Sequence, residues 1–179
     1  MKRVFTVLAL LIVVLLASVG AYLYSKQPTR QGQVELRNLQ GSVTVRYDER
    51  GVPHIRAENE TDLYRALGYV HAQDRLFQME AMRRLARGEL AEVLGPKLLD
   101  TDKLFRSLRI RERAARYVAS LDKQSPAWKA LQAYLDGINQ YQDSHAAPIE
   151  FDVLGIPKRP FTAEDSISVA GYMAYSFAA

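Results

Sequence analysis

The side chains that could perform chemistry are few and scattered in this sequence of 179 residues. It contains no cysteine, which excludes a thiolate nucleophile, a thiolate metal site and a disulfide framework. The three histidines, His54, His71 and His145, lie too far apart in sequence to form a local zinc-binding motif. A catalytic histidine needs a positioned nucleophile or carboxylate, and the sequence identifies none for His54, so a packed or edge-strand role is favoured. Residue types alone therefore predict no catalytic residue and no metal ligand in this chain.

Charged side chains on a predicted helix have two interpretations. Apolar residues between positions 61 and 87 recur every three or four residues, which predicts one long helix. Glu80 and Arg84, or Asp74 and Gln78, would lie one turn apart on it and could form a polar site. Ion pairs and hydrogen bonds on a helix buried on more than one face also account for them. We favour the second interpretation because no pair of carboxylates here has a forced geometry.

Five arginines gather in another predicted helix, at residues 102–121, and could bind an anion or an acidic surface: Arg106, Arg109, Arg111, Arg113 and Arg116. Glu112 and Asp122 interrupt this positive charge, and no aromatic residues alternate with it as single-stranded nucleic acid binding favours. The formal net charge, 24 − 20 = +4, is small for this length. A solvated helix face is the favoured interpretation, and we expect no nucleic acid as partner.

The N-terminus has the pattern of an export signal. Two basic residues precede an uncharged apolar run at residues 4–24, and about 20 helical residues cover the hydrocarbon core of a bilayer. We predict that residues 1–24 are a signal peptide or a signal anchor, and both remain open because small residues at 19–21 could be a cleavage site. The basic residues stay in the cytoplasm, so the rest of the chain is exported.

The remainder divides into a polar segment and a globular region. Residues 25–33 contain Pro28 and Gly32 and are predicted to be a linker. The chain has 48% hydrophobic and 25% charged residues, which excludes collagen-like and wholly disordered classes. The last predicted helix has no stop signal before residue 179, and we therefore expect residues 34–179 to be part of a longer polypeptide.

The elements that would position these side chains make an α+β chain, mostly helical with a short N-terminal β-hairpin. Alternating residues at 43–47 and 52–56 flank Gly51 and predict the hairpin. The long helix begins at Asn59 or Thr61 and ends at Gly88, which suits a left-handed cap. Other helices are predicted at 89–94, 102–121, 126–141 and from 163 onward, with 146–161 as a loop.

Local signals mark two of these helix starts and one buried face. Ser125 can cap the helix whose first turn contains Pro126. Thr162 and Asp165 resemble a capping box with Asp in place of the usual Glu or Gln. In the helix at 102–121 four residues are expected to face inward: Leu104, Phe105, Leu108 and Tyr117.

Four blocks of residues, taken in order, carry a family resemblance. They are Tyr47-Asp-Glu-Arg-Gly-Val-Pro-His-Ile55, Gly68-Tyr-Val-His-Ala-Gln-Asp-Arg-Leu-Phe-Gln-Met-Glu80, Gly88-Glu-Leu-Ala-Glu-Val-Leu-Gly95 and Leu154-Gly-Ile-Pro-Lys-Arg-Pro-Phe161. In this order and spacing they resemble the N-terminal alpha part of the penicillin amidase family, which includes penicillin acylases and N-acyl-homoserine-lactone acylases. The resemblance covers residues 34–179.

The resemblance implies an N-terminal-nucleophile hydrolase. A precursor exported to the periplasm is expected to cut itself into alpha and beta chains that together form one αββα unit. The nucleophile would be the N-terminal serine of the beta chain, whose own α-amine can serve as its base. The resemblance therefore assigns no catalytic residue to this chain, and it names a beta chain and an N-acylated small molecule as partners.

The resemblance also implies an acyl-binding role for the last helix. Met173 and Phe177 match the family's alpha-chain Met and Phe at the acyl pocket, although spacing alone favours ordinary core. Penicillin G acylases carry Arg where this chain has Ser176, and the smaller side chain could admit a longer acyl group. Family members can bind calcium through a Glu beyond the end of this sequence, so calcium is an implied cofactor with no ligand in this chain.

Two functions follow as hypotheses. The leading one is the alpha portion of a periplasmic N-acyl amide hydrolase that contributes pocket wall. The alternative is a membrane-tethered helical interaction module without catalysis, which would fold on its own as residues 25–179. A lone alpha portion should instead expose apolar helix faces and aggregate.

Overall fold

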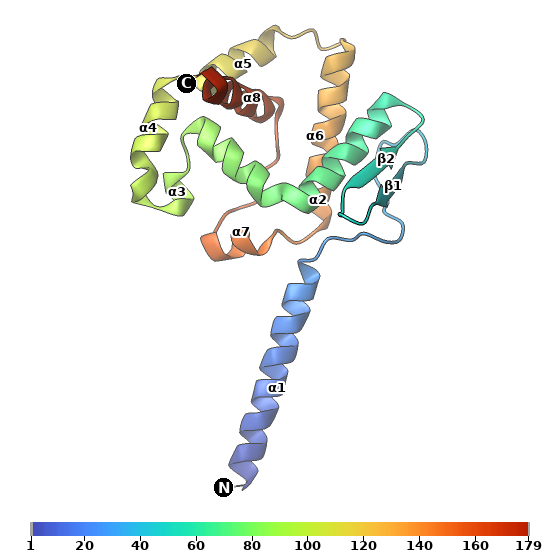
Figure 1. Ribbon diagram of the computed structural model, residues 1–179, viewed down its shortest axis with the longest axis vertical. Helices are drawn as coiled ribbons and strands as arrows, with labels where there is room; N and C mark the ends of the chain where they lie inside the picture. The colour runs from blue at the N-terminus through green and yellow to red at the C-terminus, as the bar shows by residue number, and fades with distance from the viewer. Residues whose placement is uncertain (1, 179) are drawn as a thin grey trace.

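The computed structural model describes residues 2–178, and Met1 and Ala179 lie outside the described residues. One long helix projects from a body of shorter helices and a two-stranded hairpin (Figure 1). The bounds in chain order are α1 Lys2–Ser25, β1 Thr44–Tyr47, β2 Pro53–Arg56, α2 Glu60–Arg87, α3 Ala91–Leu94, the 3-10 turn η1 Pro96–Leu98, α4 Leu99–Ser107, α5 Ile110–Ser120, α6 Pro126–Ser144, α7 Ile149–Leu154 and α8 Ala163–Ala178. The expected fold class, mostly helical with an N-terminal hairpin, is confirmed for this chain. The αββα unit requires a second chain and stays a prediction.

β1 and β2 form the antiparallel hairpin that the alternating residues predict. Val45 pairs with Ile55 across the two strands. In the connecting turn the Asp48 carboxylate accepts a hydrogen bond from the backbone N–H of Val52 at 2.8 Å, and Gly51 adopts φ +75°. Glycine has no Cβ and adopts this left-handed conformation without a steric penalty.

α2 and α6 cross in direct backbone contact, and this crossing organises the body. A Cβ atom on Gly68 would lie 1.9 Å from the carbonyl oxygen of Tyr134, and one on Gly137 would lie 1.9 Å from that of Arg65. Only glycine fits at either position. The buried core gathers around the crossing and consists of Tyr69, Ala72, Leu76, Leu135, Ile138, Tyr141, Phe151, Ile156, Phe161 and Ala163.

The two ends of α2 form as the sequence predicts. The side chain of Asn59 accepts the backbone N–H of Asp62 at 2.8 Å, and Gly88 ends the helix at φ +66°. Arg75 departs from helical geometry, with φ −139° and ψ 18°, so α2 is kinked between its two halves. The N-terminal half crosses α6, and the C-terminal half carries the charged residues described below.

The prediction of a single helix at residues 102–121 is wrong. The chain forms two helices, α4 and α5, with Arg109 between them in the left-handed conformation at φ +54°. Phe105 is buried as expected, but Leu104 and Tyr117 are 45% and 54% exposed. The break lets Phe105 and Ile110, on different helices, both pack against α8.

The region predicted as a loop at 146–161 also contains a helix. Pro148 precedes the short helix α7, and Gly155 ends it at φ +64°. Phe151 is 2% exposed and inserts into the core, which is the packing that holds this turn in place.

Candidate functional site

The three residues expected at an acyl pocket lie together on the outer face of α8. Met173 is 48% exposed and Phe177 is 85% exposed, and Ser176 lies between them on the surface. Residues four apart share one helix face, so Met173 and Phe177 present a continuous apolar strip. The hydroxyl of Ser176 donates to the backbone oxygen of Met173 at 2.9 Å. No other part of the described chain covers this strip closely enough to bury it.

The opposite side of α8 packs against α4 and α5. The ring of Phe105 meets Tyr172 and Tyr175 edge-on, with ring centroids 5.4 and 5.9 Å apart. A Cβ on Gly171 would lie 3.0 Å from the side chain of Ile110. A groove of about 590 Å³ runs between α5 and α8 and is lined by residues including Tyr117, Ala174 and Tyr175. These contacts fix which face of α8 remains exposed.

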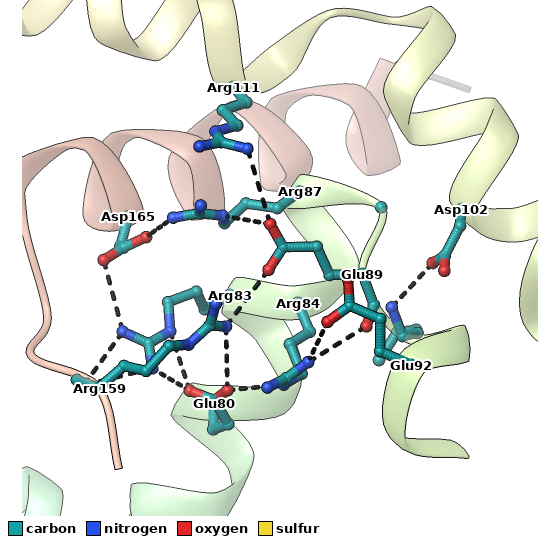
Figure 2. Close-up of polar contacts among 12 residues, drawn as sticks. Glu80, Arg83, Arg84, Arg87, Glu89, Glu92, Asp102, Arg111, Arg159 and Asp165 are labelled. Atoms are coloured by element: carbon teal, nitrogen blue, oxygen red, sulfur yellow. Dashed lines mark hydrogen bonds and ion pairs between the residues drawn. The ribbon is translucent and has the colours of Figure 1, made fainter. Parts of the chain in front are cut away.

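A buried cluster of charged residues connects the C-terminal half of α2 to the start of α8 (Figure 2). At its centre Glu80 is completely buried. Its carboxylate accepts from Arg84 Nε at 2.6 Å and from Arg83 Nε at 2.9 Å, and Arg159 lies 3.4 Å away on the chain leading to α8. Carboxylate and guanidinium groups that pair in this way compensate one another for the loss of water.

Asp165 joins this cluster from the first turn of α8 (Figure 2). Its carboxylate accepts from Arg87 at 2.8 Å and lies 3.5 Å from Arg83, and it also accepts the backbone N–H and the hydroxyl of Thr162, both at 2.9 Å. Burial alone would raise the pKa of Asp165, but Arg87, Thr162 and Arg83 outweigh burial and hold it below its ordinary value. The predicted capping box at Thr162 is therefore formed, and its acid is also an ion-pair partner.

Glu89 extends the cluster beyond the end of α2. It pairs with Arg87 at 2.9 Å and with Arg159 at 3.2 Å, and Arg111 of α5 approaches to 3.8 Å. Burial would raise the pKa of Glu89, and the two nearer arginines more than reverse this, so its pKa is lowered. The cluster thus holds together α2, the connection before α8, and the first turn of α8.

The histidines and acids do not meet in a catalytic or metal-binding arrangement. Among residues 2–178 there is no group of three or more His, Asp or Glu side chains placed to hold a metal ion. His54 lies 3.4 Å from Asp48 on the exposed hairpin. His71 contacts the hydroxyl of Tyr134 at 2.8 Å, and His145 stacks on Tyr141 with a ring-centroid distance of 4.6 Å.

A protein-family model described as penicillin amidase matches residues 42–179. The chain belongs to the penicillin amidase family. Penicillin acylase 2 proenzyme from Pseudomonas sp. strain SE83 is 42% identical over 143 residues, which are 79% of this chain and 18% of that protein. Acyl-homoserine lactone acylase QuiP from Pseudomonas putida is 41% identical over 123 residues, 68% of this chain and 15% of that protein. The chain therefore spans less than a fifth of the length of these family members.

A solved family structure supports the fold. A thermostable penicillin G acylase from Alcaligenes faecalis matches with a TM-score of 0.67 and 33% sequence identity, over 76% of this chain and 74% of that chain. Penicillin amidase membership was expected from the sequence blocks and is confirmed.

Sequence reasoning found part of the buried cluster and missed the rest. The pairing of Glu80 with Arg84 was predicted from their four-residue spacing, and it is present. The roles of Arg159 and Asp165 were not predicted because they lie more than 75 residues away along the chain. A usable signal was present: Arg83 and Arg84 follow one another on a helix interpreted as buried on more than one face, and an arginine that is buried there needs an acidic partner.

Proposed function

We propose that this chain is the alpha portion of an exported hydrolase of N-acyl amide bonds, acting on an acyl-homoserine lactone or a penicillin-like amide. Membership of the penicillin amidase family supports this, as do relatives named as acylases of both kinds. One observation carries the proposal for this chain: α8 presents Met173 and Phe177 on one exposed face. An apolar face of this kind suits a pocket wall that a second chain completes.

The proposed organisation has three parts. Residues 1–24 act as signal peptide or signal anchor, residues 25–33 connect it to the body, and residues 34–179 form the alpha-chain region. Arg3–Ser25 is the one helix among the described residues that is long and apolar enough to cross a membrane, and its position near the N-terminus suits either role. The body would then fold and function in the periplasm.

The proposed reaction uses a nucleophile from the partner beta chain. The N-terminal serine of that chain would attack the amide carbonyl while its own α-amine, with an ordinary pKa of about 7.7–8.0, takes the hydroxyl proton. The leaving amine receives that proton, an acyl-enzyme forms, and water then hydrolyses it to the carboxylic acid. Oxyanion-hole donors would stabilise both tetrahedral intermediates. This chain breaks no bond in the proposed scheme; it binds the acyl group.

Calcium has no assigned step in the proposal. The described residues offer no cluster that could hold the ion, and the ligand implied by the family lies outside this sequence. Calcium therefore enters only as an ion that the family resemblance implies, and the proposal routes no step through it.

Ser176 indicates which acyl groups the proposed enzyme would prefer. Penicillin G acylases carry Arg at this position, and serine leaves more room beside Met173 and Phe177. The hydroxyl already has a partner in the backbone of its own helix, so it presents little unpaired polarity to an acyl chain. We therefore propose a preference for acyl-homoserine lactones with long acyl chains over phenylacetyl amides.

The test is hydrolysis by the full-length protein. The purified enzyme is assayed against acyl-homoserine lactones of graded chain length and against penicillin G, and its chains are sequenced from their N-termini. The proposal expects homoserine lactone release that increases with chain length and a second chain beginning with serine. Strong turnover of penicillin G alone would contradict the interpretation of Ser176. No hydrolysis of either class, together with cooperative folding of residues 25–179 alone, would favour the interaction module instead.

A further inference from the structure

The end of α1 is fastened to α7 by specific polar contacts. Lys26, the first residue after α1, has only 12% of its side chain exposed. Its ammonium group donates to Asp152 at 2.5 Å and to the backbone oxygen of Ala147 at 2.8 Å. The hydroxyl of Tyr22, in the last turn of α1, donates to the same Asp152 oxygen at 2.5 Å. The Lys26 ammonium holds the pKa of Asp152 below its ordinary value, so the carboxylate stays charged in this contact.

When α1 spans a bilayer, this contact fixes the distance of α7 from the membrane surface. Every described side chain from Arg3 to Ser25 is exposed, and the segment is 23 residues long. Such a helix spans the hydrocarbon core with its last turn at the lipid–water boundary. Tyr22, Tyr24 and Lys26 have the residue types that are enriched at that boundary, because each has an apolar body and a polar tip. Figure 1 shows α7 on the side of the body that faces α1.

α7 itself has an apolar face that is partly exposed among the described residues. Phe151 inserts into the core at 2% exposure, and this fixes the rotation of the helix. Val153, two positions later and so on the far side of the helix, is 76% exposed. Ile149 lies one turn earlier on the same face as Val153 and is 39% exposed. Asp152, between these two faces, points to the end of α1.

We propose that the exposed face of α7, formed by Ile149 and Val153, rests on the lipid surface of the membrane leaflet from which α1 emerges. The occupant is lipid because Tyr22 and Lys26 join α7 to the end of α1, and the surroundings of α1 are lipid when it spans the bilayer. Burial of two aliphatic side chains adds to the membrane affinity of α1 only modestly, so its consequence is orientation. The body is held in one pose, with α5 on the far side from the membrane (Figure 1).

This inference is independent of the proposed catalysis, and it requires that α1 is retained in the mature protein. Residues 1–179 contain no cysteine, so a single introduced thiol can report position. Val153→Cys in the full-length protein, with any cysteine beyond residue 179 replaced by serine, is labelled with a fluorophore and reconstituted in phosphatidylethanolamine–phosphatidylglycerol vesicles. Lipids with a nitroxide on the headgroup then quench labels that lie at the surface.

The matched control is Tyr117→Cys on α5, a position that is also more than half exposed. We expect headgroup-nitroxide lipid to quench the label at 153 at least about twofold more strongly than the label at 117. Asp152→Asn should reduce the difference because it weakens the hold on Lys26. If labelling at 153 disturbs folding, Ile149→Cys reports the same face.

Three results would overturn the inference. The first is equal quenching at 153 and 117. The second is a mature protein whose mass shows that α1 has been removed. The third is a label at 153 that is protected from both lipid-borne and water-soluble quenchers, which would show that another protein segment covers α7.

Discussion

A Cβ atom on Gly68 would lie 1.9 Å from the carbonyl oxygen of Tyr134. The backbones of α2 and α6 therefore touch at this point, and Gly137 makes the reciprocal contact with Arg65. The obstacle in both cases is backbone, which cannot rotate away as a side chain can. The whole arrangement of the body depends on two positions that accept no side chain.

Gly68→Ala should destabilise the protein severely. Overpacking a core typically costs about 1–3 kcal/mol even where neighbours can move, so we expect a loss above that range in urea denaturation. Gly171→Ala is the matched control, since its Cβ meets only the side chain of Ile110 at 3.0 Å and alanine improves helix propensity by about 1 kcal/mol. Similar losses in both variants would contradict the backbone contact.

Removing the charge of Glu80, which is completely buried, should lower stability strongly. Glu80→Gln removes the one carboxylate that Arg83 and Arg84 share and leaves them only Asp165 and the more exposed Glu92 as acidic partners. Breaking a buried pair in this way costs about 3–5 kcal/mol. Asp100→Asn is the control, because its pair with Lys103 is almost fully exposed and such pairs contribute little. A thermal unfolding midpoint for Glu80→Gln as high as that of Asp100→Asn would refute the structural role of the cluster.

Asp165 and Asp62 occupy equivalent places and allow a paired test of how α8 is held. Each lies in the first turn of its helix, three residues after the capping residue to which it is hydrogen-bonded, which is Thr162 for Asp165 and Asn59 for Asp62. Each also pairs with an arginine. Both Asp165→Asn and Asp62→Asn should lower stability. Only Asp165→Asn should change the ratio of kcat/KM between long-chain and short-chain acyl substrates, because only Asp165 fixes the position of α8. Identical ratios in the two variants would show that the cluster does not position the proposed pocket wall.

Stability should fall at acid pH in a specific window. The folded-state pKa values of Asp165 and Glu89 lie below their ordinary values, so the unfolded chain binds more protons than the folded one as these groups titrate. Their contribution is complete above the unfolded pKa values, about 3.9 for Asp and 4.3 for Glu, and is lost as pH falls through the lower folded values. Urea denaturation at a series of pH values should show this loss, and Asp165→Asn should reduce its slope. A flat profile for the unaltered protein below pH 4 would contradict the lowered pKa values.

His71 should cause a further loss of stability that begins at a higher pH than the loss from Asp165 and Glu89. Loss of water from part of the ring lowers the pKa of His71, although the side chain remains partly exposed, and the positive charge of Arg75 lowers it further. The unfolded chain therefore takes up a proton first, below its ordinary pKa of about 6.5, and stability begins to fall there as pH decreases. His71→Gln should remove this step and leave the steps of Asp165 and Glu89 unchanged.

Local signals in the sequence were sufficient for much of the fold. Gly51 with alternating residues on both sides specified the hairpin, and Asn59 and Gly88 specified the ends of α2, because each of these signals acts within a few residues. The box formed by Thr162 and Asp165 was also predictable, since its hydrogen bonds are local.

The errors arose where distant packing decided the structure. Arg109 has no sequence feature that favours a left-handed conformation, and the break there depends on how Phe105 and Ile110 both reach α8. α7 was not predicted because Pro148 and Gly155 on either side of it are typical of a loop. Phe151 stabilises this helix by packing into the core. The charged cluster joins residues far apart in sequence, so periodicity could supply Glu80 and Arg84 but not their partners.

The most direct test of the central claim compares Phe177→Ala and Met173→Ala with Leu99→Ala in the full-length enzyme. Leu99 is as exposed as Met173 and lies on α4, outside the proposed pocket wall. The claim predicts that Phe177→Ala and Met173→Ala each lower kcat/KM for a long-chain acyl-homoserine lactone by about tenfold or more, as loss of apolar contacts in a substrate pocket does, while Leu99→Ala leaves it unchanged. Values for the two α8 variants that match Leu99→Ala would contradict the claim that α8 binds the acyl group.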